Sequence, residues 1–288
     1  MNSTFWNELK RNYIAGGSTV KLIVWNSIIF LFIQLLLLFS RLSQNEDLNQ
    51  FVFNFFTLNT NLSEFIYRPW GIITSFFSHF LFFHWLFNML MLYFAGQLFE
   101  RYFSSKKIVI LYFLGGIFGG IFEILAHLFF PQISPVTSVV GASGSIMAIF
   151  IGLAFYKPQL KVSLFGAFEL KIIYLAFIYL FYELISIGIP DGTAHFAHIG
   201  GAFIGWLVVK NVYSPTNLLN LIETFYSSHK RNKIRVKAKP VKKMSDEEFN
   251  YEKKKKQEKI DEILDKISKS GYDSLTKSEK EYLFSQSK

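Results

Sequence analysis

The residue most suited to chemistry in this chain is a serine between small residues, in the run Gly141-Ala142-Ser143-Gly144. The run follows a loop without charged residues and leads into an apolar stretch that ends near Tyr156, so we expect a helix to begin near Ser143. The glycines on both sides, Gly141 and Gly144, would let a substrate carbonyl group approach both the Ser143 hydroxyl and a neighbouring backbone N–H. Gly, Ala and Ser are also typical of tightly packed membrane helices. The run alone therefore does not establish catalysis.

Two other apolar segments carry polar residues that could meet this serine. His84 and Asn88 are four positions apart, on one face of a predicted helix, and His195 and His198 stand at the start of the last apolar segment. A strongly polar group at membrane depth is costly unless it has a partner or a water-filled cavity. The topology predicted below puts all of these positions toward the outer side of a membrane, at one depth. This convergence favours a shared site.

The chemistry that such a site offers is acyl transfer. A serine hydroxyl is a weak nucleophile and needs a base within hydrogen-bond reach, and a neutral histidine suits this role near pH 7. We choose His198 as the base, because Gly201 and Gly205 follow it and would let its helix pack closely against the helix of Ser143. No intramembrane Asp on the outer side suggests itself as a third member. We therefore expect a Ser–His dyad in which packing orients the ring.

The remaining polar residues of the apolar segments receive supporting roles. His84 and Asn88 can donate hydrogen bonds to a tetrahedral oxyanion, together with the Ser143 backbone N–H. His195, one turn before the base, is expected to be structural or supportive. His79 is interpreted as an interfacial residue. Interhelical hydrogen bonds are the preferred interpretation of three further residues, which are Glu123, His127 and Glu183.

A metal centre and a transporter are the alternatives for these buried polar groups. His79 and His84 are five positions apart, and His195 and His198 three, so two ligands from each helix are conceivable. The sequence lacks a His-Glu-x-x-His motif and an acidic ligand at the same depth, so we expect no metal and no cofactor. The apolar segments also show no evident inverted repeat of the kind found in transporters.

Composition indicates the membrane environment that these residues require. Of 288 residues, 51% are hydrophobic, and the 34 phenylalanines fall mostly in long apolar blocks. The absence of cysteine excludes disulfides, thiolate catalysis and zinc–thiolate sites. The first 21 residues lack the apolar core and cleavage site of a removable signal peptide. The formal charge of +9 is concentrated in the last quarter of the chain, so it describes a tail and not the whole surface.

Six apolar segments are predicted to cross the membrane, which makes this an all-α membrane protein. The Lys and Arg clusters between crossings all fit an arrangement with both termini in the cytoplasm. Residues 40–77 are too polar to span and too aromatic for a plain loop, so we expect an external segment with interfacial helices. The predicted crossings are residues 20–39, 78–99, 108–130, 143–156, 170–187 and 194–209.

The chain is thus divided into a cytoplasmic N-terminus (1–19), a six-helix core (20–212), a basic linker (213–244) and a small helical cytoplasmic tail (245–288). The basic residues between 229 and 243 favour contact with anionic lipid over nucleic acid. Ser245 with Glu248, and Thr276 with Glu279, resemble helix N-caps. Gly271 should end the first tail helix.

Taken together, these motifs resemble the rhomboid family of intramembrane serine proteases across about residues 20–210. The matching elements occur in the family's order and are highly specific as a set. They are Tyr67-Arg68, His84-x-x-x-Asn88, Gly96 with Glu100, Gly141-Ala142-Ser143-Gly144, and Ala197-His198-Ile199-Gly200-Gly201 with Gly205.

The resemblance implies a six-helix core, a Ser143–His198 dyad, and an oxyanion site made of His84, Asn88 and the Ser143 amide. It also implies that the first external segment, which contains Arg68, supports the fold, and that the fifth helix gates substrate access. One departure is Met147, which stands where well-known bacterial members have a tyrosine stacked on the catalytic histidine. A thioether can still pack against a ring, so we expect altered histidine positioning and retained activity.

We therefore expect a protease of a bacterial cytoplasmic membrane that cleaves transmembrane segments of other proteins near the outer face. Its partners would be the lipid bilayer and transmembrane substrates that unwind easily, and not nucleic acid. A catalytically inactive rhomboid-like protein that binds membrane helices is the alternative. The sequence does not indicate the oligomeric state.

Overall fold

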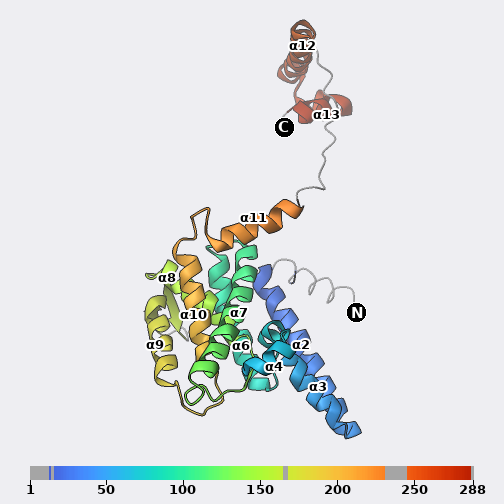
Figure 1. The fold of residues 1–288 in the computed structure, drawn as a ribbon. Coiled ribbons are helices and arrows are strands. Elements are labelled where there is room, and N and C mark those ends of the chain that lie inside the picture. Colours follow the sequence, from blue (N-terminus) through green and yellow to red (C-terminus); the bar gives the residue numbers. More distant parts are fainter. Residues whose placement is uncertain (1–12, 14–15, 165–167, 231–244, 287–288) are drawn as a thin grey trace. The chain divides into compact units, whose positions relative to one another are not determined.

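The computed structural model describes residues 13, 16–164, 168–230 and 245–286. The chain divides into two compact units, with the boundary between residues 231 and 232. Figure 1 shows the helices of the first unit and the two longer helices of the second. The prediction of an all-α protein is confirmed, with short two-stranded pairs as the only sheet in the described residues.

Six apolar helices of the first unit lie close to the predicted crossings. Three of them are long and apolar enough to cross a membrane: α2 (Gly17–Ser43), α6 (Phe82–Glu100) and α7 (Ser105–Phe129). The other three are α8 (Ser143–Tyr156), α9 (Ile172–Ile185) and α10 (His195–Lys210), with 14, 14 and 16 residues. At about 1.5 Å per residue these are shorter than a hydrocarbon core of about 30 Å. The number of crossings therefore stays a prediction.

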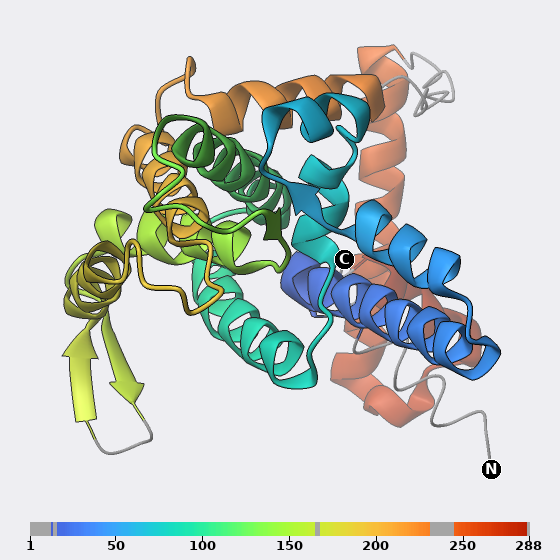
Figure 2. The ribbon, with the colours of Figure 1, turned by 60° about the horizontal axis from the view of Figure 1, so that its bottom comes forward.

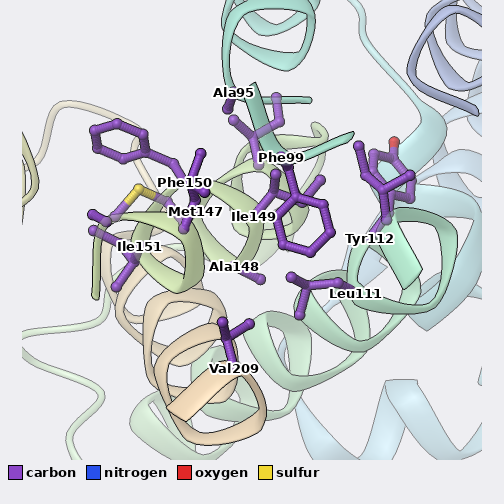
Figure 3. Close-up of a cluster of buried hydrophobic side chains, with 14 of the residues drawn as sticks. Ala95, Phe99, Leu111, Tyr112, Met147, Ala148, Ile149, Phe150, Ile151 and Val209 are labelled. Carbon is purple, nitrogen blue, oxygen red and sulfur yellow. The ribbon is translucent and has the colours of Figure 1, made fainter. Parts of the chain in front are cut away.

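Helix α8 lies at the centre of this unit. Every residue from Gly144 to Ala154 is buried, and α8 packs against α6, α7, α9 and α10 (Figures 1 and 2). Figure 3 shows part of the apolar core around it, where Met147, Ile149 and Phe150 of α8 are surrounded by side chains of neighbouring helices. Ser143, the first residue of α8, thus stands at the end of a helix that is buried along most of its length.

Small residues bring α10 unusually close to α8. A Cβ atom on Gly201 would overlap the Gly144 carbonyl oxygen, and one on Gly205 would overlap the Ala148 carbonyl oxygen. Only glycine permits this backbone approach, as the sequence led us to expect. The close contact fixes the start of α10 beside the start of α8.

The segment between α2 and α6 contains short helices and one strand. The helices are α3 (Glu46–Phe56), α4 (Leu62–Tyr67), α5 (Gly71–Thr74) and the 3-10 helix η1 (Ser75–Phe77). The strand β1 (Leu58–Asn59) pairs in antiparallel fashion with β2 (Ser138–Val139), just before Gly141. The segment is therefore bonded directly to the loop that precedes Ser143, a link that the sequence did not reveal.

A β-hairpin connects α8 to α9. The strands β3 (Lys161–Leu164) and β4 (Phe168–Lys171) pair from Lys161 with Lys171 to Leu164 with Phe168, and Figure 2 shows the hairpin projecting from the helices of the first unit. From the sequence we expected only a polar connection here and a fifth helix that began near Leu170. That start is corrected to Ile172, because Leu170 pairs with Val162 in the hairpin.

A further helix, α11 (Leu218–Lys230), was not predicted from the sequence and occupies part of the expected linker. Its Glu223 accepts a hydrogen bond from Ser104 Oγ at 2.7 Å and lies 3.8 Å from Lys107 Nζ. These contacts attach α11 to the beginning of α7. The predicted basic stretch lies mostly in residues 231–243, outside the described residues.

The second unit consists of α12 (Asp246–Ser270), the 3-10 helix η3 (Tyr272–Ser274) and α13 (Lys277–Gln286). Both predicted caps are confirmed: Ser245 and Glu248 form a capping box, and Glu279 accepts a hydrogen bond from the Thr276 backbone at 2.7 Å. Lys266 Nζ lies 3.0 Å from both Glu279 oxygens and so links α12 to α13.

Candidate active site at the starts of helices α8 and α10

Ser143 and His198 meet at the junction of the two helices. The Ser143 Oγ atom lies 2.7 Å from His198 Nε2, at hydrogen-bond distance. Ser143 is partly buried and His198 is buried. If the serine hydroxyl donates, Nε2 carries the lone pair, and the proton of a neutral ring must stand on Nδ1. The arrangement is that of a nucleophile and its base.

The loop before Ser143 turns sharply at Gly141. Its φ angle is +119°, in the region that favours glycine, and a Cβ atom there would lie 2.7 Å from the ring of His84. The Gly141 backbone N–H donates to the Ser75 carbonyl at 3.0 Å, and the Ala142 N–H points at His79 Nε2, 3.4 Å away. Gly141 thus permits His84 to lie against the backbone beside Ser143.

His84 and Asn88 of α6 face the same space as Ser143. Both line a cavity of about 520 Å³, together with Ser143, His198 and Glu183. Asn88 Nδ2 donates one hydrogen bond to the His84 carbonyl at 2.8 Å and keeps a second hydrogen. Asn88 Oδ1 has no partner among the described residues. The site therefore places two side chains with donor capacity beside the nucleophile.

Glu183 makes the interhelical hydrogen bond expected from the sequence, with His195, but its place beside the base was not predicted. It lies on α9 and is 1% exposed, with Oε2 2.7 Å from His195 Nδ1 and Oε1 2.9 Å from His198 Nδ1. The second contact is short, but the oxygen stands off the N–H direction, so it is a close polar contact and not a well-aligned hydrogen bond. The expectation that no acidic ligand lies at the depth of the histidines is thus corrected.

A signal for Glu183 was present in the sequence. Glu183 stands in the last turn of one apolar helix, and only nine residues separate that helix from the next. Because this connection is short, the end of α9 and the start of α10 must lie next to each other and at the same depth. Asp191, in this connection, places Oδ1 3.4 Å from His195 Nε2.

Ligand-type atoms of Glu183, His195 and His198 lie within 4.8 Å of one another. Two ligands of a tetrahedral zinc, each about 2.0 to 2.1 Å from the metal, are about 3.3 Å apart. The Glu183 oxygens stand 2.7 and 2.9 Å from the two ring nitrogens. These distances are those of direct contacts between the side chains, so the cluster is one of hydrogen bonds and charge contacts.

The other buried acid, Glu123 of α7, has the interhelical role expected from the sequence. It accepts hydrogen bonds from Ser134 Oγ at 2.7 Å and from the Ala197 backbone N–H at 2.9 Å. His127 Nδ1 lies 2.9 Å from the Ser134 carbonyl oxygen. Glu123 and His127 therefore secure the loop after α7, and Glu123 also holds the first turn of α10.

Two residues expected to support the site, Arg68 and Glu100, lie in contacts away from it. Arg68 donates to Asn54 Oδ1 and to Glu64 Oε2, both at 2.6 Å, within the segment between α2 and α6. Glu100 accepts the backbone N–H groups of Ser18 at 2.8 Å and Thr19 at 3.1 Å, and so caps the start of α2. Both stabilise local structure.

Met147 is buried one turn after Ser143. It lines a small cavity of about 120 Å³ together with Ser143, Asn88 and Tyr179. The sequence led us to expect its thioether against the ring of the base. In the structure its described surroundings are this cavity and the apolar core shown in Figure 3.

Comparison with known proteins supports the family that the sequence motifs resemble. The family model for the rhomboid domain matches residues 67–214, about half of the chain, and this match includes Ser143 and His198. The chain belongs to the rhomboid family. Together with three long apolar helices, this makes the rhomboid chain an integral membrane protein. A second family model, of unknown function (DUF6576), matches residues 244–288.

Curated relatives of this rhomboid come from Arabidopsis thaliana. RHOMBOID-like protein 12, mitochondrial, is 28% identical, over 46% of this chain and 43% of the relative. Inactive RHOMBOID-like protein 8 is 31% identical, over 46% of this chain and 35% of the relative. RHOMBOID-like protein 4 is 32% identical, over 43% of this chain and 29% of the relative. The chain thus spans less than half the length of these relatives.

Proposed function

We propose that this rhomboid is an intramembrane serine endopeptidase that cleaves transmembrane segments of other proteins. The observation that carries the proposal is the 2.7 Å contact between Ser143 Oγ and His198 Nε2 inside a cavity of about 520 Å³. A hydroxyl beside an imidazole, with donors around the position of a carbonyl oxygen, is the arrangement required for acyl transfer.

The reaction proceeds in two halves. Ser143 Oγ attacks the scissile carbonyl carbon while His198 Nε2 takes the hydroxyl proton, and the carbonyl oxygen becomes an oxyanion beside His84, Asn88 and the Ser143 N–H. When the C–N bond breaks, His198 gives its proton to the leaving amine. A water, deprotonated by His198, then attacks the acyl ester and releases Ser143.

An apolar groove between α6 and α9 offers the substrate a path from the lipid. It has a volume of about 620 Å³, and Tyr179 and Tyr182 line both it and the cavity that contains Ser143. A stable helix has no backbone carbonyl free for attack. The proposed substrates are therefore membrane helices with small residues that unwind near the outer face, in keeping with cytoplasmic termini for this chain.

The alternative is an inactive rhomboid that binds membrane helices. One relative is named as inactive, over a region 31% identical to this chain. What favours the enzyme here is that both Ser143 and His198 are present and in contact.

A fluorophosphonate probe, which reacts with activated serines, distinguishes the two functions. We expect the purified full chain to be labelled, and the Ser143→Ala and His198→Ala variants to remain unlabelled. A matched control is Ser145→Ala, the next serine of α8, whose labelling should equal that of the wild type. Folded wild-type protein that neither reacts with the probe nor cleaves a transmembrane peptide would contradict the proposal.

A further inference from the structure

The tautomer of His198 gives Glu183 a specific relationship to the proposed reaction. For Nε2 to accept the Ser143 proton, the neutral ring must carry its own proton on Nδ1. That nitrogen lies 2.9 Å from Glu183 Oε1. A carboxylate at this position favours the tautomer with the proton on Nδ1 over the one with the proton on Nε2, in which Ser143 would face a donor.

The same contact acts during the reaction. When His198 takes the proton from Ser143 Oγ, the ring becomes a cation whose Nδ1–H faces the carboxylate. Opposite charges attract far more strongly in a buried site than in water. The Oε1 atom stands off the N–H direction in the free protein. Contacts of this kind are often poorly aligned before substrate binds and tighten in the reacting complex.

The carboxylate itself is held in place. His195 Nδ1 lies 2.7 Å from Glu183 Oε2, and His195 Nε2 lies 3.4 Å from Asp191 Oδ1. Glu183 is 1% exposed and is the only acidic residue of α9, whose other residues are all apolar or tyrosine. An acid buried in such a helix is costly unless it is paired. The two histidines of α10 are partners of this carboxylate.

We propose that Glu183 is a positioning residue that completes a Ser143–His198–Glu183 triad, with His195 as the residue that anchors the carboxylate. The inference rests on the proposed function and deepens it. In this proposal a carboxylate from a third helix, α9, orients the ring of His198, whereas the sequence led us to expect that packing alone orients it.

The test uses the full chain in liposomes and a synthetic transmembrane peptide with a fluorophore and a quencher on either side of a central Ala-Gly pair. In Glu183→Gln the amide keeps the shape but loses the charge. We expect kcat to fall between about 10-fold and 10³-fold, with KM within about threefold of the wild type. For comparison, exchanging the triad carboxylate for an amide in chymotrypsin-type enzymes lowers kcat by about 10⁴-fold.

Rescue by the conservative variant separates positioning from a purely structural role. Glu183→Asp retains the charge at a shorter reach, and we expect its kcat to exceed that of Glu183→Gln at least threefold. Glu100→Gln removes a carboxylate that caps α2, and it should lower the thermal midpoint while leaving kcat of the folded protein near that of the wild type.

Each result decides one proposal. If Glu183→Gln keeps the wild-type kcat, or if Glu183→Asp and Glu183→Gln lose kcat equally while folded, Glu183 is not a positioning residue and the protease proposal stands. If Glu183→Gln does not fold, His195→Phe decides, because it removes the 2.7 Å contact that anchors the carboxylate, and an unchanged kcat in that folded variant refutes the inference. A folded wild type without turnover overturns both proposals.

Discussion

The Ser143 hydroxyl and the His198 ring are 55 positions apart in the chain and lie 2.7 Å apart in space. Each belongs to the first turn of its helix, and the two helices touch along backbone without intervening side chains. The meeting of the two groups therefore depends on the glycines of α10 as much as on the groups themselves.

Replacing Gly201 by Ala should separate these helices. A Cβ atom there would overlap the Gly144 carbonyl oxygen, which is backbone and cannot rotate away. Overpacking of this kind costs about 1 to 3 kcal/mol, so we expect a lower thermal midpoint and weaker fluorophosphonate labelling. Phe203→Leu, on the exposed side of α10, is the matched control and should change neither. Wild-type stability and labelling in Gly201→Ala would show that the close approach is not required.

Replacing Asn88 by Ala removes one proposed oxyanion donor. Loss of a single donor of this type costs about 10²–10³ in rate, and we expect this in kcat with little change in KM. Cleavage of the fluorogenic transmembrane peptide measures both constants. Gln34→Ala, which removes another side-chain amide at the Phe80 carbonyl before α6, is a control for local structure. An unchanged kcat in folded Asn88→Ala would remove Asn88 from the oxyanion site.

Replacing Gly141 by Ala tests the loop before Ser143. The new methyl group would meet the His84 ring at 2.7 Å and would stand on a backbone with a φ angle of +119°. We expect a loss of about 1 to 3 kcal/mol in stability from the strained backbone, and reduced labelling because the ring is displaced. The double variant with His84→Ala should recover part of the stability, since the overlap is gone. No recovery would assign the whole loss to the backbone angle.

The second unit should respond to acid through Glu279. Hydrogen bonds from the Thr276 backbone and side chain, together with Lys266, lower the pKa of this carboxyl from 4.5 to about 2. A depressed pKa means that the stabilising contact is fully present above about pH 4.5 and is lost as the pH falls toward 2. Hydrogen exchange of the α13 amides in the full chain should therefore accelerate across this range. In Glu279→Gln the acceleration should be absent, and equal behaviour of the two proteins would contradict the assignment.

The candidate site was largely foreseeable, because its signals are local. The positions of His84, Asn88, Ser143 and His198 relative to helix starts follow from apolar periods and charge-free loops, and the caps at Ser245 and Thr276 follow from short motifs. For Glu183 the interhelical hydrogen bond was predicted correctly, but its contact with His198 was not, because that contact depends on which helix lies beside the end of α9. That is a tertiary relationship, and it becomes visible only when connection length is considered.

The missed secondary structure has a similar explanation. The β1–β2 pair has two residues in each strand, too few for an alternating pattern to register. The hairpin at residues 161–171 was not predicted, because its lysines were interpreted only as evidence that this connection lies in the cytoplasm. Helix α11 was not predicted, because its segment was assigned as a linker from its basic charge. Asn217 does provide an N-cap, since its Oδ1 accepts a hydrogen bond from the Leu219 backbone N–H at 2.9 Å.

Helix α9 is the least anchored of the six, with only Ile172, Ala176 and Glu183 buried. The residue that aligns the base thus belongs to the helix with the fewest buried residues of the six. An outward tilt of α9, which would widen the groove toward the lipid, also withdraws the carboxylate from His198. A substrate helix would then enter the groove before His198 is aligned. A segment that enters the groove only in part would meet Ser143 without an aligned base.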